Sequence, residues 1–167
     1  LFRQGKRLMA EQRDDEACDA FEQSFAIDPE IGAQLNVAHC YQEWGKLAHA
    51  YTSYKSAQEM AREANADRAG EIEGLVKKID PSVPRLTLHA PKDADTATLM
   101  IDGEHVEDIT EPIVLDPGPH KVEYTTATGS KKSKTLPIEK GQMVYGLCRS
   151  LEEASGAVIA GAKLTAI

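Results

Sequence analysis

Five histidines, set in an acidic chain, are the first residues to consider for chemistry. His89, His105 and His120 fall on expected strands or turns, and with Asp102 they could converge on one point of the fold. Imidazole nitrogens and carboxylate oxygens bind metal ions, and a histidine beside an aspartate can move a proton. The simpler alternative is a set of surface and turn histidines. We favour it because nothing in their spacing fixes a shared site.

Common catalytic and metal-binding motifs are missing from the sequence. It contains no His-Glu-x-x-His, no Cys-x-x-Cys, no Gly-x-Ser-x-Gly and no glycine-rich phosphate loop. His39 and His49 lie ten residues apart on separate expected helices, which is not the spacing of two ligands on one helix face. We therefore predict a protein that is not an enzyme and that uses no cofactor and no metal ion.

Three cysteines cannot all pair within one chain. Cys18 falls on the second helix of one expected helical hairpin, and Cys40 on the first helix of the next. Neighbouring helices of stacked hairpins could bring the two sulfurs together, although the sequence does not fix their separation. The alternative is two buried thiols that pack as small hydrophobic groups. Cys148 falls on an expected strand, and we predict a free thiol there.

Composition and charge restrict the classes of partner. The 167 residues are 41% hydrophobic and 28% charged, as in soluble globular domains. The net charge of −8 argues against nucleic acid and anionic membranes, because both need a positive footprint. No apolar run approaches the roughly 18 residues of a membrane span, so membrane contact is expected only through segments outside this chain. Because the chain begins with Leu1 and not Met, we expect that residues upstream of Leu1 have been removed or left out, and the sequence does not show whether they form a signal peptide.

The sequence between Gly5 and Ala57 contains two copies of one helical-hairpin pattern. Five positions recur at an interval of 33 residues, in the order small, large, small, aromatic, small: Gly5/Ala38, Leu8/Tyr41, Ala17/Ala50, Phe21/Tyr54 and Ser24/Ala57. Small residues let two helices cross closely, while larger ones fill the gaps beside the crossing. The expected helices span 1–11, 14–27, 30–43 and 47–64. Asp28 is expected as the N-cap and Pro29 at the first position of the third helix, with Gly45 in the second hairpin's turn.

A further helix and then a strand-rich half follow the second hairpin. Apolar residues between Ala69 and Ile79 repeat at helical spacing, so we expect a helix that caps the hairpins. From Arg85 the hydrophobic pattern alternates with a period of two and predicts about seven short strands, with a strong turn signal at Asp102-Gly103. The predicted fold is α+β with two modules. A helical domain covers 1–80, a small antiparallel β-sandwich covers 85–150, and a tail of uncertain structure covers 151–167.

The helical half resembles the tetratricopeptide repeat over roughly residues 1–62. The resemblance rests on Gly5 or Ala38, on the Ala-x-x-x-aromatic pairs Ala17/Phe21 and Ala50/Tyr54, and on Pro29 after the first hairpin. The chain departs from the family in its 33-residue interval, against roughly 34 residues, and in lacking an early Trp in each repeat and a Pro after the second.

The resemblance implies a concave face lined by the first helix of each hairpin. It places Phe2, Lys6 and Met9, with Leu35, His39 and Gln42, in a groove that holds a protein or peptide segment. Phe2 and Lys6 stand where carboxylate-clamp members carry Lys and Asn, so that activity is not expected. The alternative for Phe2 and Leu35 is a role as terminal core residues.

Two narrower resemblances concern location. The run LFRQGKRLMA…ACDAFEQSFAIDP…LNVAHCYQEWGKLAHAY is similar to repeat proteins of the cell envelope in myxobacteria and their relatives. Cysteines recur there at the positions of Cys18 and Cys40, which implies a disulfide. The run MIDGEHV…PIVLDPGPHKVEY…IEKGQMVYGL resembles the PEGA-type surface β-domain, with Pro91-Lys92-Asp93-Ala94 near the place of its Pro-Glu-Gly-Ala element.

These features predict a non-enzymatic protein–protein interaction adaptor or scaffold of the bacterial periplasm or cell envelope. One alternative is a carbohydrate- or peptidoglycan-binding module in the β-domain. It is weakened because Tyr124 and Tyr145 are the only aromatic residues from 85 onward, and sugar sites usually stack on rings. Another alternative is the sensor or regulatory part of a larger signalling protein. Three free thiols would point instead to the cytoplasm.

Overall fold

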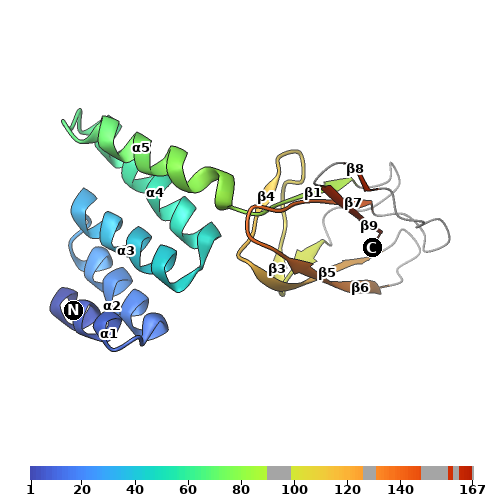
Figure 1. Cartoon of the computed structure of the whole chain (residues 1–167), viewed down its shortest axis with the longest axis horizontal. Coiled ribbons are helices and arrows are strands. Elements are labelled where there is room, and N and C mark those ends of the chain that lie inside the picture. The colour runs from blue at the N-terminus through green and yellow to red at the C-terminus, as the bar shows by residue number, and fades with distance from the viewer. Residues whose placement is uncertain (90–98, 126–130, 148–157, 160–161, 167) are drawn as a thin grey trace. The chain divides into compact units, whose positions relative to one another are not determined.

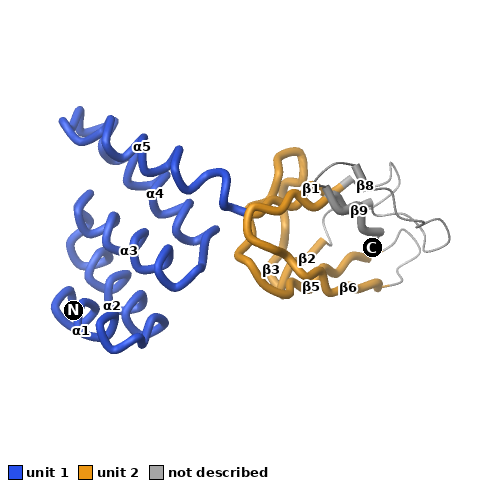
Figure 2. Tube along the Cα trace, viewed as in Figure 1, with its two compact units in different colours: residues 1–83 blue, residues 84–167 orange. Residues whose placement is uncertain are grey.

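The computed structural model describes residues 1–89, 99–125, 131–147, 158–159 and 162–166. The chain divides into two compact units, residues 1–83 and residues 84–167 (Figure 2). The first unit is helical and the second is made of β-strands (Figure 1). The change of hydrophobic period near Arg85 therefore predicted the α+β order correctly.

The first unit contains five α-helices and a short 3₁₀ turn. They are α1 (Phe2–Ala10), α2 (Asp14–Ile27), α3 (Ile31–Trp44), α4 (Leu47–Glu63), α5 (Ala69–Ile79) and η1 (Asp80–Ser82). Each helix packs against the next one in the chain (Figure 1). Ala17, Ala38, Ala50 and Ala57 are fully buried, so the small positions of the repeat lie at the contacts between helices.

Gly5 shows why a small residue is needed where α1 meets α2. A Cβ atom at this position would lie 3.0 Å from two carbons of the Phe21 ring. Phe21 and Leu8 are both buried and fill the space beside the crossing. The small-and-large alternation in the sequence is therefore a packing pattern.

The start of α3 differs from the prediction, whereas its end agrees. The Glu30 amide donates to the Asp28 carbonyl at 2.9 Å, which makes a tight turn around Pro29. Glu30 then serves as an extended N-cap, so the helix begins at Ile31 and Pro29 stays outside it. At the other end Gly45 has a φ of 84°, the left-handed conformation that favours glycine after a helix.

The described residues of the second unit form two sheets. The strands are β1 (Arg85–His89), β2 (Met100–Ile101), β3 (Glu104–His105), β4 (Ile113–Val114), β5 (Gly118–Thr125), β6 (Lys131–Ile138), β7 (Met143–Leu147), β8 (Val158–Ile159) and β9 (Ala162–Ala166). The strand order is β4-β1-β7-β9-β8 in one sheet and β3-β2-β5-β6 in the other. Asp102 and Gly103 have φ values of 53° and 88° and join β2 to β3, as their turn signal predicted.

The predicted antiparallel arrangement is wrong for the five-stranded sheet, which is mixed. In this sheet β7 pairs in parallel with both β1 and β9, whereas β4 and β8 pair in antiparallel fashion with their neighbours. Short turns reveal only strands that are joined directly, and such strands must be antiparallel. Between β1 and β7 the chain adds β4 to this sheet and builds the other sheet, so β7 can return in the direction of β1.

Segment 151–167, which the sequence left undecided, contributes the last two strands. β9 pairs with β7 from Met143↔Ala162 to Leu147↔Ala166, and β8 pairs with β9. The remaining residues of this segment lie outside the described part of the chain, as do Cys148 and the run 91–94.

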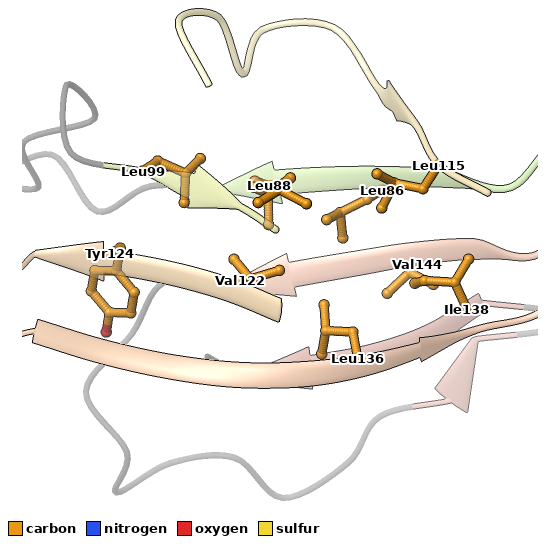
Figure 3. Packing of buried hydrophobic residues seen from close by; sticks show 10 residues of the cluster. Leu86, Leu88, Leu99, Leu115, Val122, Tyr124, Leu136, Ile138 and Val144 are labelled. Carbon is orange, nitrogen blue, oxygen red and sulfur yellow. The ribbon is translucent and has the colours of Figure 1, made fainter. Parts of the chain in front are cut away.

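Side chains from both sheets meet in one buried cluster (Figure 3). Leu86, Leu88 and Val144 come from the five-stranded sheet, and Ile101, Val122, Tyr124, Leu136 and Ile138 come from the four-stranded sheet; Leu99 and Leu115 complete the cluster. Core residues two apart on β1, β5 and β6 face the same side of their strands, which explains the period of two in the sequence.

Candidate functional site

A disulfide joins the two helical hairpins. Cys18 on α2 and Cys40 on α3 are bonded, with their Cα atoms 5.5 Å apart, and both residues are buried. This is the pairing that the family resemblance implied, and the alternative of two separate thiols does not apply. The bond holds α2 against α3, and α3 carries half of the predicted groove residues.

The predicted groove residues of α1 lie about one helical turn apart. The Phe2 ring packs on the Phe21 ring with a centroid distance of 5.8 Å, yet Phe2 remains 41% exposed. The Lys6 ammonium lies 5.2 Å from the centroid of the Phe2 ring. Met9 is half-buried. Phe2 thus touches the interior on one side and leaves an aromatic surface next to a positive charge.

The predicted groove residues of α3 divide into two kinds. Leu35 packs against the buried cluster that contains Ala57 of α4 and Ile72 of α5. The Gln42 side-chain oxygen accepts a hydrogen bond from the Tyr54 hydroxyl at 3.0 Å. His39 is exposed, with its Nδ1 atom 3.9 Å from a Glu43 carboxylate oxygen. Leu35 and Gln42 therefore make contacts inside the unit, whereas His39 faces solvent.

The Tyr54 hydroxyl, which carries its proton, binds the Gln42 side chain through a hydrogen bond. Burial raises the pKa of the Tyr54 hydroxyl, and the nearby Glu43 carboxylate raises that pKa further. The hydroxyl therefore stays protonated through the neutral range and donates a hydrogen bond to the Gln42 side-chain oxygen. This bond fixes the orientation of Gln42 on α3.

An open pocket that sequence reasoning missed lies at the end of the α3–α4 hairpin opposite Gly45. Its volume is about 540 Å³, and it is lined by Pro29, Glu30, Ile31, Gly32, Met60, Glu63 and Ala64. The pocket forms because antiparallel packing brings the start of α3 beside the end of α4. The Asp-Pro turn at one end of the hairpin was its only sequence signal.

Of the histidines considered for a shared site with Asp102, His120 alone meets it among the described side chains, and the favoured alternative was a set of surface and turn histidines. His120 Nδ1 lies 2.6 Å from Asp102 Oδ2, and Nε2 lies 2.7 Å from the main-chain oxygen of Asp116. The other Asp102 carboxylate oxygen accepts a hydrogen bond from the Lys121 amide at 2.7 Å. His105 is exposed on β3, and the side chain of His89 is outside what the structure describes.

We call the contacts of the His120 ring with Asp102 and with the Asp116 main-chain oxygen the His120 clasp. Its geometry is that of a structural contact. The His120 side chain is only 13% exposed, and both ring nitrogens are engaged with the protein, so neither is directed at a substrate. Burial raises the pKa of Asp102, but hydrogen bonds from the Lys121 amide and the His120 ring lower it more, and the net pKa lies below its usual value. The clasp ties the Asp102-Gly103 turn to the first residues of β5.

Tyr124, the one aromatic residue of the β unit whose side chain the structure describes, is unsuited to stacking on a sugar. Tyr124 is buried in the cluster between the sheets (Figure 3), so its ring has no free face. The side chain of Tyr145 lies outside the described residues. The carbohydrate alternative therefore gains no support from Tyr124.

Within the described ranges, no three His, Cys, Asp or Glu side chains gather where they could hold a metal ion. No helix in those same ranges is both long and apolar enough to cross a membrane. Comparisons with models of known families, with curated proteins and with solved structures found no match.

Proposed function

We propose that this protein is a non-enzymatic adaptor whose helical unit holds a segment of a partner protein. In this proposal α1–α4 are two tetratricopeptide-like hairpins and α5 is their capping helix. The burial of Gly5 and Ala38 at one step of the repeat, and of Ala17 and Ala50 at another, supports this assignment.

The observation that carries the proposal is the exposed Phe2 ring on α1. Large aromatic side chains that rest on the core and still reach solvent are typical binding anchors. The contact with Phe21 already orients the ring, so less conformational entropy is lost when a partner binds. Lys6 above the ring adds a positive charge that can pair with a carboxylate of the partner.

The second unit is proposed to be a small β-sandwich of the PEGA-like type that contacts a second partner or the cell surface. The support is the single buried cluster to which both sheets contribute. Mixed pairing in one sheet is compatible with a sandwich, because the cluster depends on which face a residue occupies and not on strand direction.

The proposed location is an oxidising compartment, with the bacterial periplasm or cell envelope as the setting. The support is the disulfide between Cys18 and Cys40, because such bonds persist outside the reducing cytoplasm. A thiol count on unreduced, denatured protein checks this directly. The location requires a single reactive thiol, that of Cys148.

The adaptor proposal is tested by capture with matched surface variants. Immobilised, unreduced protein is incubated with envelope extract, and the captured proteins are quantified by mass spectrometry. We expect a specific partner to be lost from Phe2→Ser and from Lys6→Glu, and retained by Lys55→Glu, which changes an exposed lysine of α4. Circular dichroism verifies that each variant is folded. Equal capture by all three variants would refute the role of the α1 surface.

A further inference from the structure

We propose that the pocket between the start of α3 and the end of α4 binds the side chain of an arginine or lysine on the partner segment. This inference rests on the proposed function and goes further by naming the chemistry of one anchor. It concerns a place on the helical unit that is separate from the exposed Phe2 ring. The two can therefore succeed or fail independently.

The walls of the pocket suit an aliphatic stem. Ile31 and Met60 are partly buried there, and Pro29 and Ala64 add further apolar surface. Methionine adapts its flexible thioether to different shapes, which suits a site for a long, unbranched side chain. The pocket has a volume of about 540 Å³ and is open to solvent, so a long side chain can lie along its wall with its head near the surface.

Two of the residues that line the pocket, Glu30 and Glu63, are acidic and have no basic side-chain partner in the described part of the chain. Neither carboxylate accepts a hydrogen bond from any residue in that part of the chain. Other glutamates of the helical unit, such as Glu16 and Glu73, are paired with neighbouring basic side chains. Two unpaired carboxylates beside an apolar wall complement a side chain with a hydrocarbon stem and a cationic head.

The same charges argue against an anionic occupant. The start of α3 could by itself attract an anion through its free amide groups. A phosphate or carboxylate in this pocket would, however, lie next to both Glu30 and Glu63, and like charges at short range repel. The cationic side chain is therefore the occupant that both the apolar walls and the two glutamates favour.

Gly32 offers a way to close the pocket without disturbing the helix. A Cβ atom at Gly32 would meet no atom within 4 Å, so Gly32→Leu places a larger side chain in open space at the pocket wall. Gly74 on α5 is equally open and lies outside the pocket, so Gly74→Leu is the matched control.

The test uses the full, unreduced chain and N-acetylarginine methylamide as the probe. Binding is followed through the NMR signals of the Met60 and Ile31 methyl groups and the Gly32 amide. The corresponding citrulline compound has nearly the same shape and no charge, so it isolates the electrostatic part. We expect saturable shifts with arginine at millimolar concentration, at least fivefold weaker binding of citrulline, and weaker arginine binding at high salt. Equal shifts with both compounds, or none with arginine, would overturn the proposal.

The variants then assign the effect to the pocket. Glu30→Gln/Glu63→Gln keeps the shape of both side chains and is expected to weaken arginine binding at least fivefold. Gly32→Leu should do the same, while Gly74→Leu binds as the wild type does. If both pocket variants bind arginine normally, the inference is wrong. A partner that depends on Phe2 would still be captured in that case, so the adaptor proposal would stand.

Discussion

At the scale of single residues, Gly5 and Gly74 are predicted to respond oppositely to the same substitution. Alanine favours a helix over glycine by about 1 kcal/mol, so Gly74→Ala, in open space on α5, should raise the free energy of unfolding by up to that amount. Gly5→Ala gains the same propensity but forces a methyl group to 3.0 Å from the Phe21 ring. Overpacking of this kind costs about 1–3 kcal/mol, so a net loss of about 1 kcal/mol is expected.

Urea unfolding followed by helical circular dichroism measures both changes. The double variant Gly5→Ala/Phe21→Leu is the control, because a smaller side chain at Phe21 relieves the close approach. If Gly5→Ala proves as stable as Gly74→Ala, then α1 and α2 do not cross as closely as the structure shows.

The His120 clasp predicts a dependence of stability on acid pH. Because the pKa of Asp102 is lower in the folded state than its ordinary value of about 3.9, the unfolded chain binds more protons in acid. The stability from Asp102 is therefore present above that ordinary value and is lost as the pH falls through the folded pKa. The wild-type free energy of unfolding should fall more steeply between about pH 5 and pH 2 than that of Asp102→Asn.

Asp102→Asn is a suitable comparison because asparagine also tolerates the positive φ of this turn. At neutral pH this substitution should cost about 1 kcal/mol, which is less than is usual for hydrogen bonds to a charged group, because the Asp102 side chain is 46% exposed and solvent screens its charge. The Thr110 hydroxyl and amide lower the pKa of Asp108, so Asp108 also makes stability depend on acid pH. Its contribution is the same in the wild type and in Asp102→Asn, and it therefore cancels when the two pH profiles are compared. Parallel pH profiles would show that the clasp does not stabilise the fold.

At the scale of secondary-structure elements, the disulfide is predicted to stabilise α2 and α3 selectively. Cys18 and Cys40 are 22 residues apart, and closing a loop of that length contributes about 3 kcal/mol in the chain-entropy model. In Cys18→Ala/Cys40→Ala, amide hydrogen exchange in α2 and α3 should accelerate, whereas β5 and β6 should keep their protection. Reduction of the wild-type protein should give the same pattern. Unchanged exchange in both helices would contradict it.

The elements that the sequence predicted well are those governed by local rules. The buried small residues at Ala17 and Ala50 located the helical hairpins, and Gly45 marked the turn of the second one correctly. Asp102-Gly103 marked the turn between β2 and β3. The start of α3 was misplaced because a main-chain hydrogen bond around Pro29 decides it. The parallel pairing of β7 with β1 was missed because it depends on the return path of the chain and not on any turn.

At the scale of the whole molecule, the sequence predicted that a helical unit precedes a β unit. It predicted the candidate site only in part. The resemblance implied the disulfide and expected Phe2 and Lys6 in a groove, and both side chains are exposed on α1. It did not reveal that Gln42 is held by Tyr54. The pocket around Met60 was also not predictable, because it joins residues about 30 positions apart through helix packing.

The central claim, that the α1 surface holds a partner segment, is tested most directly by site-specific photo-crosslinking. A photoreactive phenylalanine replaces Phe2 on α1 in one protein, which retains the aromatic ring and Lys6, and it replaces the exposed Lys55 on α4 in the other. Each unreduced protein is irradiated in its native compartment, and the linked peptides are sequenced. The account predicts that position 2 links to one defined segment of a partner and that position 55 does not. No link from position 2, or the same links from both positions, would contradict it.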